Sequence, residues 1–190
     1  MGLANWLTVL RILLIPVIVS LLLYRKPGLA LVVFALAALT DLLDGWVARS
    51  RRIQSRLGAF LDPLADKLLL TATFLTLTHL RLLPKALTIV VISRDLTLVF
   101  GSVLIHIMGG RLHPRPTWAG KAATFFQILA VLSGLTARYV RMPGTQTVLF
   151  WVAAAFTIVS GLQYLVQGMR YLQAIEAAER EESRETTFYR

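Results

Sequence analysis

Residues 41–67, DLLDGWVARSRRIQSRLGAFLDPLADK, join two long apolar runs and hold four of the five aspartates in a chain of 190 residues. The rest of the chain is apolar: 56% of residues are hydrophobic, only 16% are charged, and the mean hydropathy is +0.67. An ordinary soluble domain has about 25% charged residues. An ionised carboxylate in apolar surroundings costs several kcal/mol unless it is paired, hydrated or metal-bound. The stretch therefore predicts a membrane protein whose function depends on these aspartates.

Six apolar runs are separated by clusters of Arg, Lys, Pro and Gly. Each run is about long enough for a helix that crosses a hydrocarbon core of roughly 30 Å. The runs occupy residues 8–24, 28–48, 60–80, 85–108, 118–137 and 146–169. We therefore predict an all-α polytopic membrane protein, a six-transmembrane-helix bundle that forms one membrane domain over residues 1–175. The polar, mixed-charge tail, residues 176–190, is expected to extend the last helix into the cytoplasm.

The net charge of +10 comes from basic residues at the ends of the apolar runs. No aromatic-rich polar face accompanies them, which argues against a nucleic-acid partner. The connection at 49–56 carries four arginines and that at 111–121 carries three basic residues, whereas the alternate connections carry two each. The positive-inside rule then places both termini and the aspartates on the cytoplasmic side. A bacterial inner membrane is favoured, and an organellar membrane stays open. The absence of cysteine excludes thiolate catalysis and cysteine-bound zinc.

The four aspartates have helical spacing on either side of the arginine-rich connection. Asp41 and Asp44 are three residues apart at the end of one predicted helix, and Asp62 and Asp66 are four apart at the start of the next. Each pair falls on one face of its helix, so a turn between the helices can bring four carboxylates together. Oxygen-only ligands of this number favour hard cations such as Mg²⁺ or Mn²⁺.

Small residues and an arginine accompany the carboxylates. Gly45, Ala48 and Gly58 leave room for a flat or bulky ligand beside the helix backbones, and Arg49 supplies a cation for phosphate oxygens. Each feature alone is often structural, as a helix cap, a packing notch or a topogenic charge. Their conjunction at fixed spacing indicates a nucleotide diphosphate bound together with metal.

The whole pattern resembles the signature of the CDP-alcohol phosphatidyltransferase family, with all eight defined positions present: Asp41-x2-Asp44-Gly45-x2-Ala48-Arg49-x8-Gly58-x3-Asp62-x3-Asp66. The segment Asn5-Trp6-Leu7-Thr8-x2-Arg11 looks like that of the phosphatidylglycerophosphate and cardiolipin synthase branches. The resemblance implies a six-helix bundle, commonly a homodimer, whose site opens to the cytoplasm and to lipid. It also implies that an acceptor hydroxyl attacks the β-phosphate of CDP-diacylglycerol and that CMP is released.

The resemblance also assigns roles to the matched positions. Two divalent cations, Mg²⁺ or Mn²⁺, would be held by the carboxylates of Asp41, Asp44, Asp62 and Asp66. Asp66 would in addition be the general base. The nucleotide would be bound by residues of the signature and of the N-terminal segment: Asn5, Thr8, Gly45, Ala48, Arg49 and Gly58. The acceptor phosphate would bind Arg94 and Lys121.

Arg94 lies in the middle of the fourth predicted span, where an arginine is costly, and we expect it to face the bundle interior. Its neighbour Asp95 is not expected to neutralise it, because adjacent residues of a helix point apart. An ion pair with another helix, of purely structural importance, is the alternative to acceptor binding.

Residues near Arg94 and Lys121 bear on the choice of acceptor. Phosphatidylglycerophosphate synthases usually show Arg-Glu, a further arginine eight residues after the first, and Gly-Lys-x-Lys-Thr. Here these elements read Arg94-Asp95, Ser102 and Gly120-Lys121-Ala122-Ala123-Thr124, so two cations expected around glycerol 3-phosphate are missing. The Arg-Asp pair and Ser160-Gly161-x2-Tyr164 look more like cardiolipin synthases, whose acceptor phosphatidylglycerol carries a singly charged phosphodiester. We favour phosphatidylglycerol, with glycerol 3-phosphate as the alternative.

Two other classes of protein are alternatives on the sequence alone. Intramembrane carboxylates also mark ion or proton transporters, but these usually spread their acids over several helices of related halves. This chain gathers its aspartates at one connection and shows no obvious second half. An inactive scaffold would keep only the bundle, and the intact Asp66 argues against it.

Overall fold

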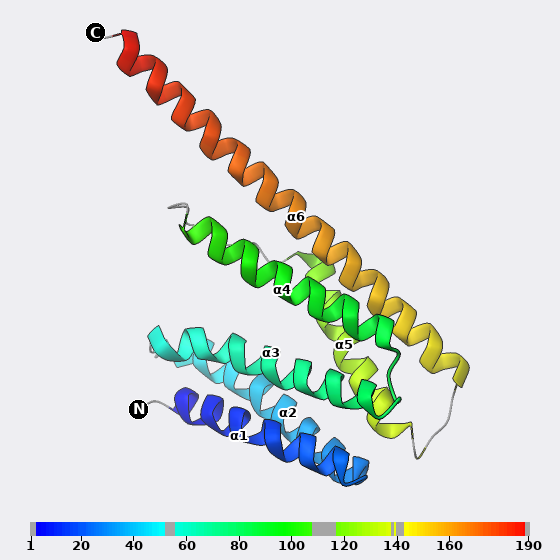
Figure 1. Ribbon diagram of the computed structural model, residues 1–190. Helices are drawn as coiled ribbons and strands as arrows, with labels where there is room; N and C mark the ends of the chain where they lie inside the picture. Colours follow the sequence, from blue (N-terminus) through cyan, green and yellow to red (C-terminus); the bar gives the residue numbers. More distant parts are fainter. Residues whose placement is uncertain (1–2, 52–55, 108–116, 138, 140–142, 189–190) are drawn as a thin grey trace. The chain divides into compact units, whose positions relative to one another are not determined.

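The computed structural model describes residues 3–51, 56–107, 117–137, 139 and 143–188, with side chains described over 9–40, 65–103, 117–137, 139, 144–171 and 173. Six helices make up the described chain (Figure 1): α1 (Leu3–Leu23), α2 (Pro27–Arg51), α3 (Arg56–His79), α4 (Lys85–Ile107), α5 (Trp118–Thr136) and α6 (Pro143–Phe188). The predicted all-α fold is confirmed.

Within the described part of the chain, three helices contain segments that are long and apolar enough to cross a membrane: Lys85–Val103, Trp118–Thr136 and Gly144–Tyr171. Shorter apolar segments, Val9–Leu23 and Pro27–Thr40, lie in α1 and α2. Large apolar side chains are exposed on most helices, among them Leu13 (60%), Phe100 (68%) and Trp151 (71%). Apolar surface of this extent is covered by lipid or by another chain in a stable protein. These features support an integral membrane protein, and the number of six crossings stays a prediction.

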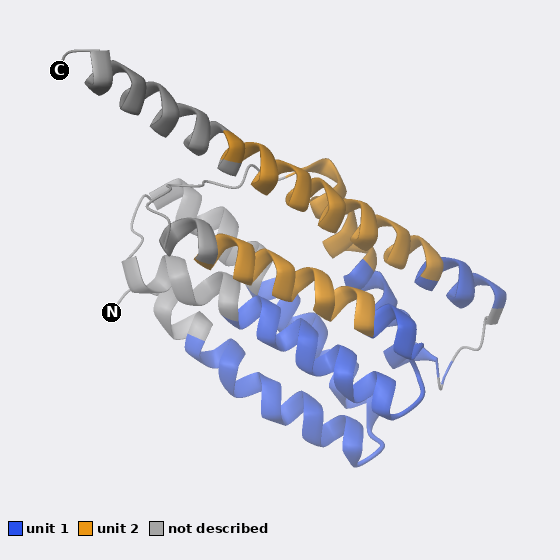
Figure 2. Cartoon of the chain, turned by 45° about the horizontal axis from the view of Figure 1, so that its top comes forward, with its two compact units in different colours: residues 1–88, 127–150 blue, residues 89–126, 151–190 orange. Residues whose placement is uncertain are grey.

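The chain divides into two compact units, which Figure 2 colours separately. Unit 1 comprises Met1–Thr88 and Gln127–Phe150, and unit 2 comprises Ile89–Phe126 and Trp151–Arg190. Helices α1 to α3 belong to unit 1, whereas α4, α5 and α6 each contribute residues to both units.

Unit 1 is organised around α1, which packs against both α2 and α3. The side of α1 that faces inward carries Arg11, Ile18 and Leu22, spaced seven and four residues apart, as expected for one stripe of a helix. Ala30 and Ala65 are fully buried. Small side chains such as these allow helices in membranes to approach closely. The position of Arg11 in this otherwise apolar stripe is the feature that needs explanation.

Helices α1 and α3 end in the same kind of turn. Arg25 and Arg81, which follow the two helices, both have a φ of 58°. The N–H of Arg25 donates to Leu22 O (3.0 Å) and that of Lys26 to Leu21 O (2.8 Å), the pattern of a helix that closes through a left-handed residue. Both turns reverse the chain tightly, so that the next helix begins within a few residues.

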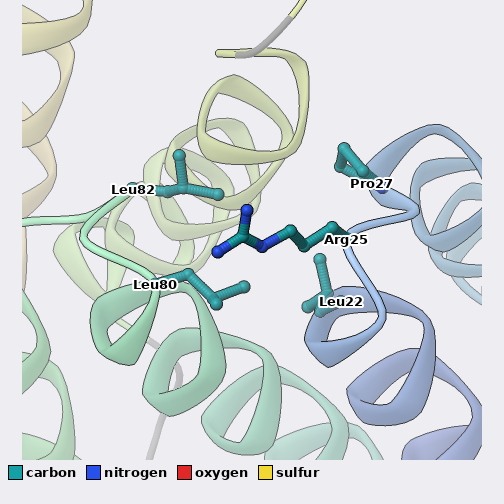
Figure 3. A pocket seen from close by; sticks show the side chains of 5 residues that line it. All are labelled: Leu22, Arg25, Pro27, Leu80 and Leu82. Atoms are coloured by element: carbon teal, nitrogen blue, oxygen red, sulfur yellow. The ribbon is translucent and has the colours of Figure 1, made fainter.

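A cavity of about 200 Å³ lies at these two turns and is lined by Leu22, Arg25, Pro27, Leu80 and Leu82 (Figure 3). Figure 3 shows the Arg25 guanidinium between Leu80 and Leu82. Leu80 directly follows α3, and the helix places it roughly 20 Å from Asp66, at a rise of about 1.5 Å per residue. The cavity is therefore distinct from the place where the aspartates are expected to act.

Unit 2 is held together by contacts among α4, α5 and α6. The rings of Phe126 and Phe156 stack with centroids 5.1 Å apart. The ring of Tyr164 covers Gly101, where an added Cβ would lie 3.0 Å from the ring, and the Tyr164 hydroxyl donates to Leu98 O at 3.2 Å. These contacts fix the part of α4 that carries Arg94.

Candidate active site

The four predicted metal ligands lie at the adjoining ends of α2 and α3. The backbone is helical at all four positions, since α2 continues through Asp41 and Asp44 to Arg51 and α3 begins at Arg56. The link between Arg51 and Arg56 spans at most about 17 Å when fully extended, so the two helix ends stay close. Connectivity therefore limits the distance between the two helix ends, and the gathering of the four carboxylates stays a prediction.

Most of the predicted metal and nucleotide ligands have side chains outside the described residues: Asn5, Thr8, Asp41, Asp44, Gly45, Ala48, Arg49, Gly58 and Asp62. Within the described part, no group of three or more His, Cys, Asp or Glu side chains could hold a metal ion. The assignments of these residues therefore stay predictions. The donor set itself, carboxylate oxygens alone, suits a hard divalent cation.

Asp66 is the predicted ligand whose side chain is described, and it pairs with α1. Its Oδ1 lies 2.5 Å from Nη1 of Arg11. The side chain of Arg11 is 5% exposed and that of Asp66 is 42% exposed. Arg11 belongs to the N-terminal motif, which does not by itself indicate a role for it. An arginine inside an apolar run was itself a signal, because intramembrane charges usually have a functional partner.

Arg94 and Asp95 form an ion pair on α4, with Nη1 and Oδ1 2.9 Å apart. Their side chains are 10% and 13% exposed, so Arg94 faces inward as predicted. The prediction that Asp95 does not neutralise Arg94 is wrong. Although adjacent side chains leave a helix in different directions, the long arginine side chain bends back to its neighbour, since a guanidinium buried to this degree needs a counter-charge.

Three polar groups from α4, α5 and α6 meet around Gly120. Arg94 Nη2 donates to Ser160 Oγ at 2.9 Å, and Thr117 caps α5 by accepting the Gly120 N–H at 3.0 Å. A Cβ added at Gly120 would lie 3.2 Å from Thr117 Oγ1, 3.4 Å from Ser160 Oγ and 3.5 Å from Arg94 Nη2. The missing side chain leaves these atoms facing one another at a helix N-terminus, where anions are favoured.

The third nitrogen of the Arg94 guanidinium, Nε, is also relevant to ligand binding. This nitrogen is buried and has no hydrogen-bond partner among the residues that the structure describes. A buried donor without a partner costs free energy, and a bound anion would remove that cost. Arg94 is therefore held by Asp95 through Nη1 and by Ser160 through Nη2, and its Nε is left for a ligand, for which a phosphate oxygen is the best acceptor by charge.

Lys121, the second predicted acceptor cation, follows Gly120 on α5 but points elsewhere. Its side chain is exposed, and its Nζ lies 5.7 Å from the centre of the Trp118 ring. Ala123, where a second lysine was noted as missing, is fully buried, and Ser102 is exposed. A lysine at position 123 would have to be buried. The alanine at this position is therefore explained by packing, whichever acceptor the protein uses.

The Ser160-Gly161-x2-Tyr164 element, noted in the sequence only as a resemblance, contacts α4 at each of its three residues. Ser160 accepts from Arg94, Tyr164 donates to Leu98 O, and a Cβ added at Gly161 would lie 3.5 Å from Arg94 Cγ. Its spacing puts all three on one face of α6. The element therefore holds both the backbone of α4 and the side chain of Arg94.

Comparisons with known proteins cover nearly the whole chain. The family model for CDP-alcohol phosphatidyltransferase matches residues 1–159. A cardiolipin synthase (CMP-forming) from Rattus norvegicus is 35% identical over 190 residues, which cover 90% of this chain and 63% of the relative.

Relatives with a different printed name match equally well. A CDP-diacylglycerol--glycerol-3-phosphate 3-phosphatidyltransferase from Bacillus subtilis is 37% identical over 146 residues, 75% of this chain and 74% of the relative. A probable phosphatidylglycerophosphate synthase from Mycobacterium tuberculosis is 32% identical over 183 residues, 92% of this chain and 85% of the relative. The chain spans 63% of the length of the rat and human cardiolipin synthases, and the two groups of relatives do not single out one acceptor.

Proposed function

Since this chain belongs to the CDP-alcohol phosphatidyltransferase family, we propose that it transfers the phosphatidyl group of CDP-diacylglycerol to a glycerol-type acceptor. The acceptor oxygen forms a bond to the β-phosphorus, the bond from that phosphorus to CMP breaks, and the acceptor proton passes to a base. The observation that carries the proposal is the complete aspartate pattern from Asp41 to Asp66, on two helix ends joined by a short connection.

In the proposed reaction, the aspartates bind the metal ions and accept the proton. Two bound divalent cations, Mg²⁺ or Mn²⁺, would neutralise the diphosphate and the leaving CMP. Asp41, Asp44 and Asp62 would hold them, together with Asp66. Asp66 would also take the acceptor proton, a role supported by a side chain that is 42% exposed even though its partner Arg11 is buried.

The nucleotide would be bound at the same helix ends. The resemblance supplies Arg49 for its phosphates and small residues beside its base, with the N-terminal segment closing the site: Gly45, Ala48, Gly58, Asn5 and Thr8. We also propose that this site faces the cytoplasm and that the protein forms a homodimer in the membrane. The basic residues around the aspartate connection and the exposed apolar side chains support these two proposals.

We infer that the acceptor is phosphatidylglycerol and that the product is cardiolipin. Arg94, Ser160 and the first turn of α5 supply donors for a phosphate, but Asp95 lies 2.9 Å from the same guanidinium and offsets its charge. A phosphodiester carries one negative charge, whereas glycerol 3-phosphate carries nearly two. With Ser102 and Ala123 where two further cations are expected around glycerol 3-phosphate, the positive charge near Arg94 suits the singly charged phosphodiester better.

The acceptor assay tests this inference directly. Purified protein is given CDP-diacylglycerol with either phosphatidylglycerol or glycerol 3-phosphate, and the lipid product is identified by mass. We expect kcat/KM for phosphatidylglycerol to be higher by about tenfold or more, the equivalent of one charge-assisted hydrogen bond. Rapid formation of phosphatidylglycerophosphate without cardiolipin would instead identify a phosphatidylglycerophosphate synthase.

Gly120→Ala is expected to raise the KM for the acceptor about tenfold and to leave the KM for CDP-diacylglycerol unchanged. The added methyl group would lie 3.2–3.5 Å from Thr117, Ser160 and Arg94 and would crowd the guanidinium that is proposed to bind the phosphate. A loss of this size is that of about one hydrogen bond to a charged group. Gly168→Ala is the matched control, since an added Cβ there meets nothing within 4 Å. If both substitutions raised the KM for the acceptor equally, the acceptor phosphate would not bind beside Gly120.

A further inference from the structure

We propose that Arg11 is a positioning residue for this reaction. Its guanidinium fixes the orientation of the Asp66 carboxylate. The inference rests on the proposed function, in which Asp66 accepts the acceptor proton. It starts from the contact between Arg11 Nη1 and Asp66 Oδ1, 2.5 Å, which joins α1 to α3 within unit 1.

The position of Arg11 on α1 is that of a core residue. It continues the buried stripe of Ile18 and Leu22, and only 4% of the residue is exposed. An apolar side chain at this point would pack without the desolvation of a guanidinium. The contact with Asp66 supplies a counter-charge for this buried arginine, and Asp66 is a proposed catalytic residue.

Arg11 and Asp66 also differ in exposure, as expected for a buried residue that positions a more exposed one. The Arg11 side chain is 5% exposed and is held among the packed helices of unit 1, whereas the Asp66 side chain is 42% exposed. A cation fixed in the interior restricts the rotamers of the carboxylate. The ion pair with α1 thus sets the geometry of an Asp66 side chain that is still 42% exposed.

The chemistry of arginine suits this role. A guanidinium is always charged and presents its donors in a rigid fork, while the ammonium of lysine is a point charge on a flexible stem. A displacement of a reacting group by about 1 Å can lower a rate by about 100-fold, so a substitution that preserves the charge still disturbs the reaction.

The test compares Arg11→Lys with Arg11→Met in purified full-length protein. For Arg11→Lys we expect kcat to fall about 10- to 100-fold, with the KM for CDP-diacylglycerol and the thermal midpoint close to those of the wild type. For Arg11→Met we expect a larger loss of kcat. Mn²⁺ binding, followed by electron paramagnetic resonance, should change by no more than about threefold in Arg11→Lys, since the charge of the ion pair is kept. Arg25→Lys, at an exposed arginine after α1, is the matched control and should match the wild type.

The outcomes separate this inference from the proposed function. A wild type that releases no CMP with either acceptor overturns the proposed function and this inference with it. An active wild type together with an Arg11→Lys protein of unchanged kcat overturns the inference alone. So does an Arg11→Lys protein whose thermal midpoint and Mn²⁺ binding fall in parallel with kcat, because Arg11 would then only maintain the fold.

Discussion

Replacing Asp41, Asp44 or Asp62 by asparagine is expected to lower the rate of CMP release by at least about 100-fold. Asparagine keeps the shape of the side chain and one oxygen but removes the negative charge. Each substitution therefore weakens the binding of a cation that would act directly on the transferred phosphate. The measurement is CMP release at saturating CDP-diacylglycerol over a range of Mg²⁺ and Mn²⁺ concentrations, where weakened ligands show as a higher metal requirement.

The control for these variants removes a charge elsewhere in the chain. Glu176→Gln, in the polar tail, deletes one carboxylate charge without altering the aspartate pattern, and its rate should equal that of the wild type. Chelation of the wild type with EDTA should abolish CMP release, and added Mg²⁺ or Mn²⁺ should restore it. Full turnover in protein shown to contain no residual metal would contradict the role of the cations.

The helices could be predicted because apolar runs of membrane length have few alternatives to a helix. The run expected at 28–48 corresponds to α2, Pro27–Arg51, and the one expected at 60–80 corresponds to α3, Arg56–His79. The differences arise where helices continue beyond the apolar part, as in α1, which begins at Leu3 and not at residue 8. The expected extension of the last helix into the tail agrees with α6, which continues to Phe188. Hydropathy marks the part of a helix that crosses the hydrocarbon core, while helix ends depend on local hydrogen bonding, so the two need not coincide.

Partners of charged side chains were harder to predict than the helices. Periodicity tells which face of a helix a residue occupies, but not how far a long side chain bends or which helix lies opposite. Asp95 was excluded as a partner of Arg94 on the direction of its Cβ alone, and the structure pairs them at 2.9 Å. The pairing of Arg11 with Asp66 joins residues far apart in sequence, which no single-helix pattern contains.

Asp66→Asn is expected to lower kcat by about 10²- to 10⁴-fold, the usual effect of removing a general base. Binding of CDP-diacylglycerol should persist, since the other carboxylates remain. The structure adds a second effect, because Arg11 is 5% exposed and would lose the negative charge beside it. Breaking a fully buried pair costs about 3–5 kcal/mol, and the cost here should be smaller because solvent reaches the 42% exposed side chain of Asp66.

A double variant separates the chemical effect from the loss of stability. Arg11→Met/Asp66→Asn removes both charges and restores an apolar residue to the stripe of Ile18 and Leu22, so its thermal midpoint should recover toward that of the wild type. Its kcat should stay as low as that of Asp66→Asn, because no base is restored. The measurements are thermal unfolding in detergent, binding of CDP-diacylglycerol and single-turnover CMP release. If the double variant regained activity together with stability, Asp66 would serve the fold alone, and the base would have to be another residue.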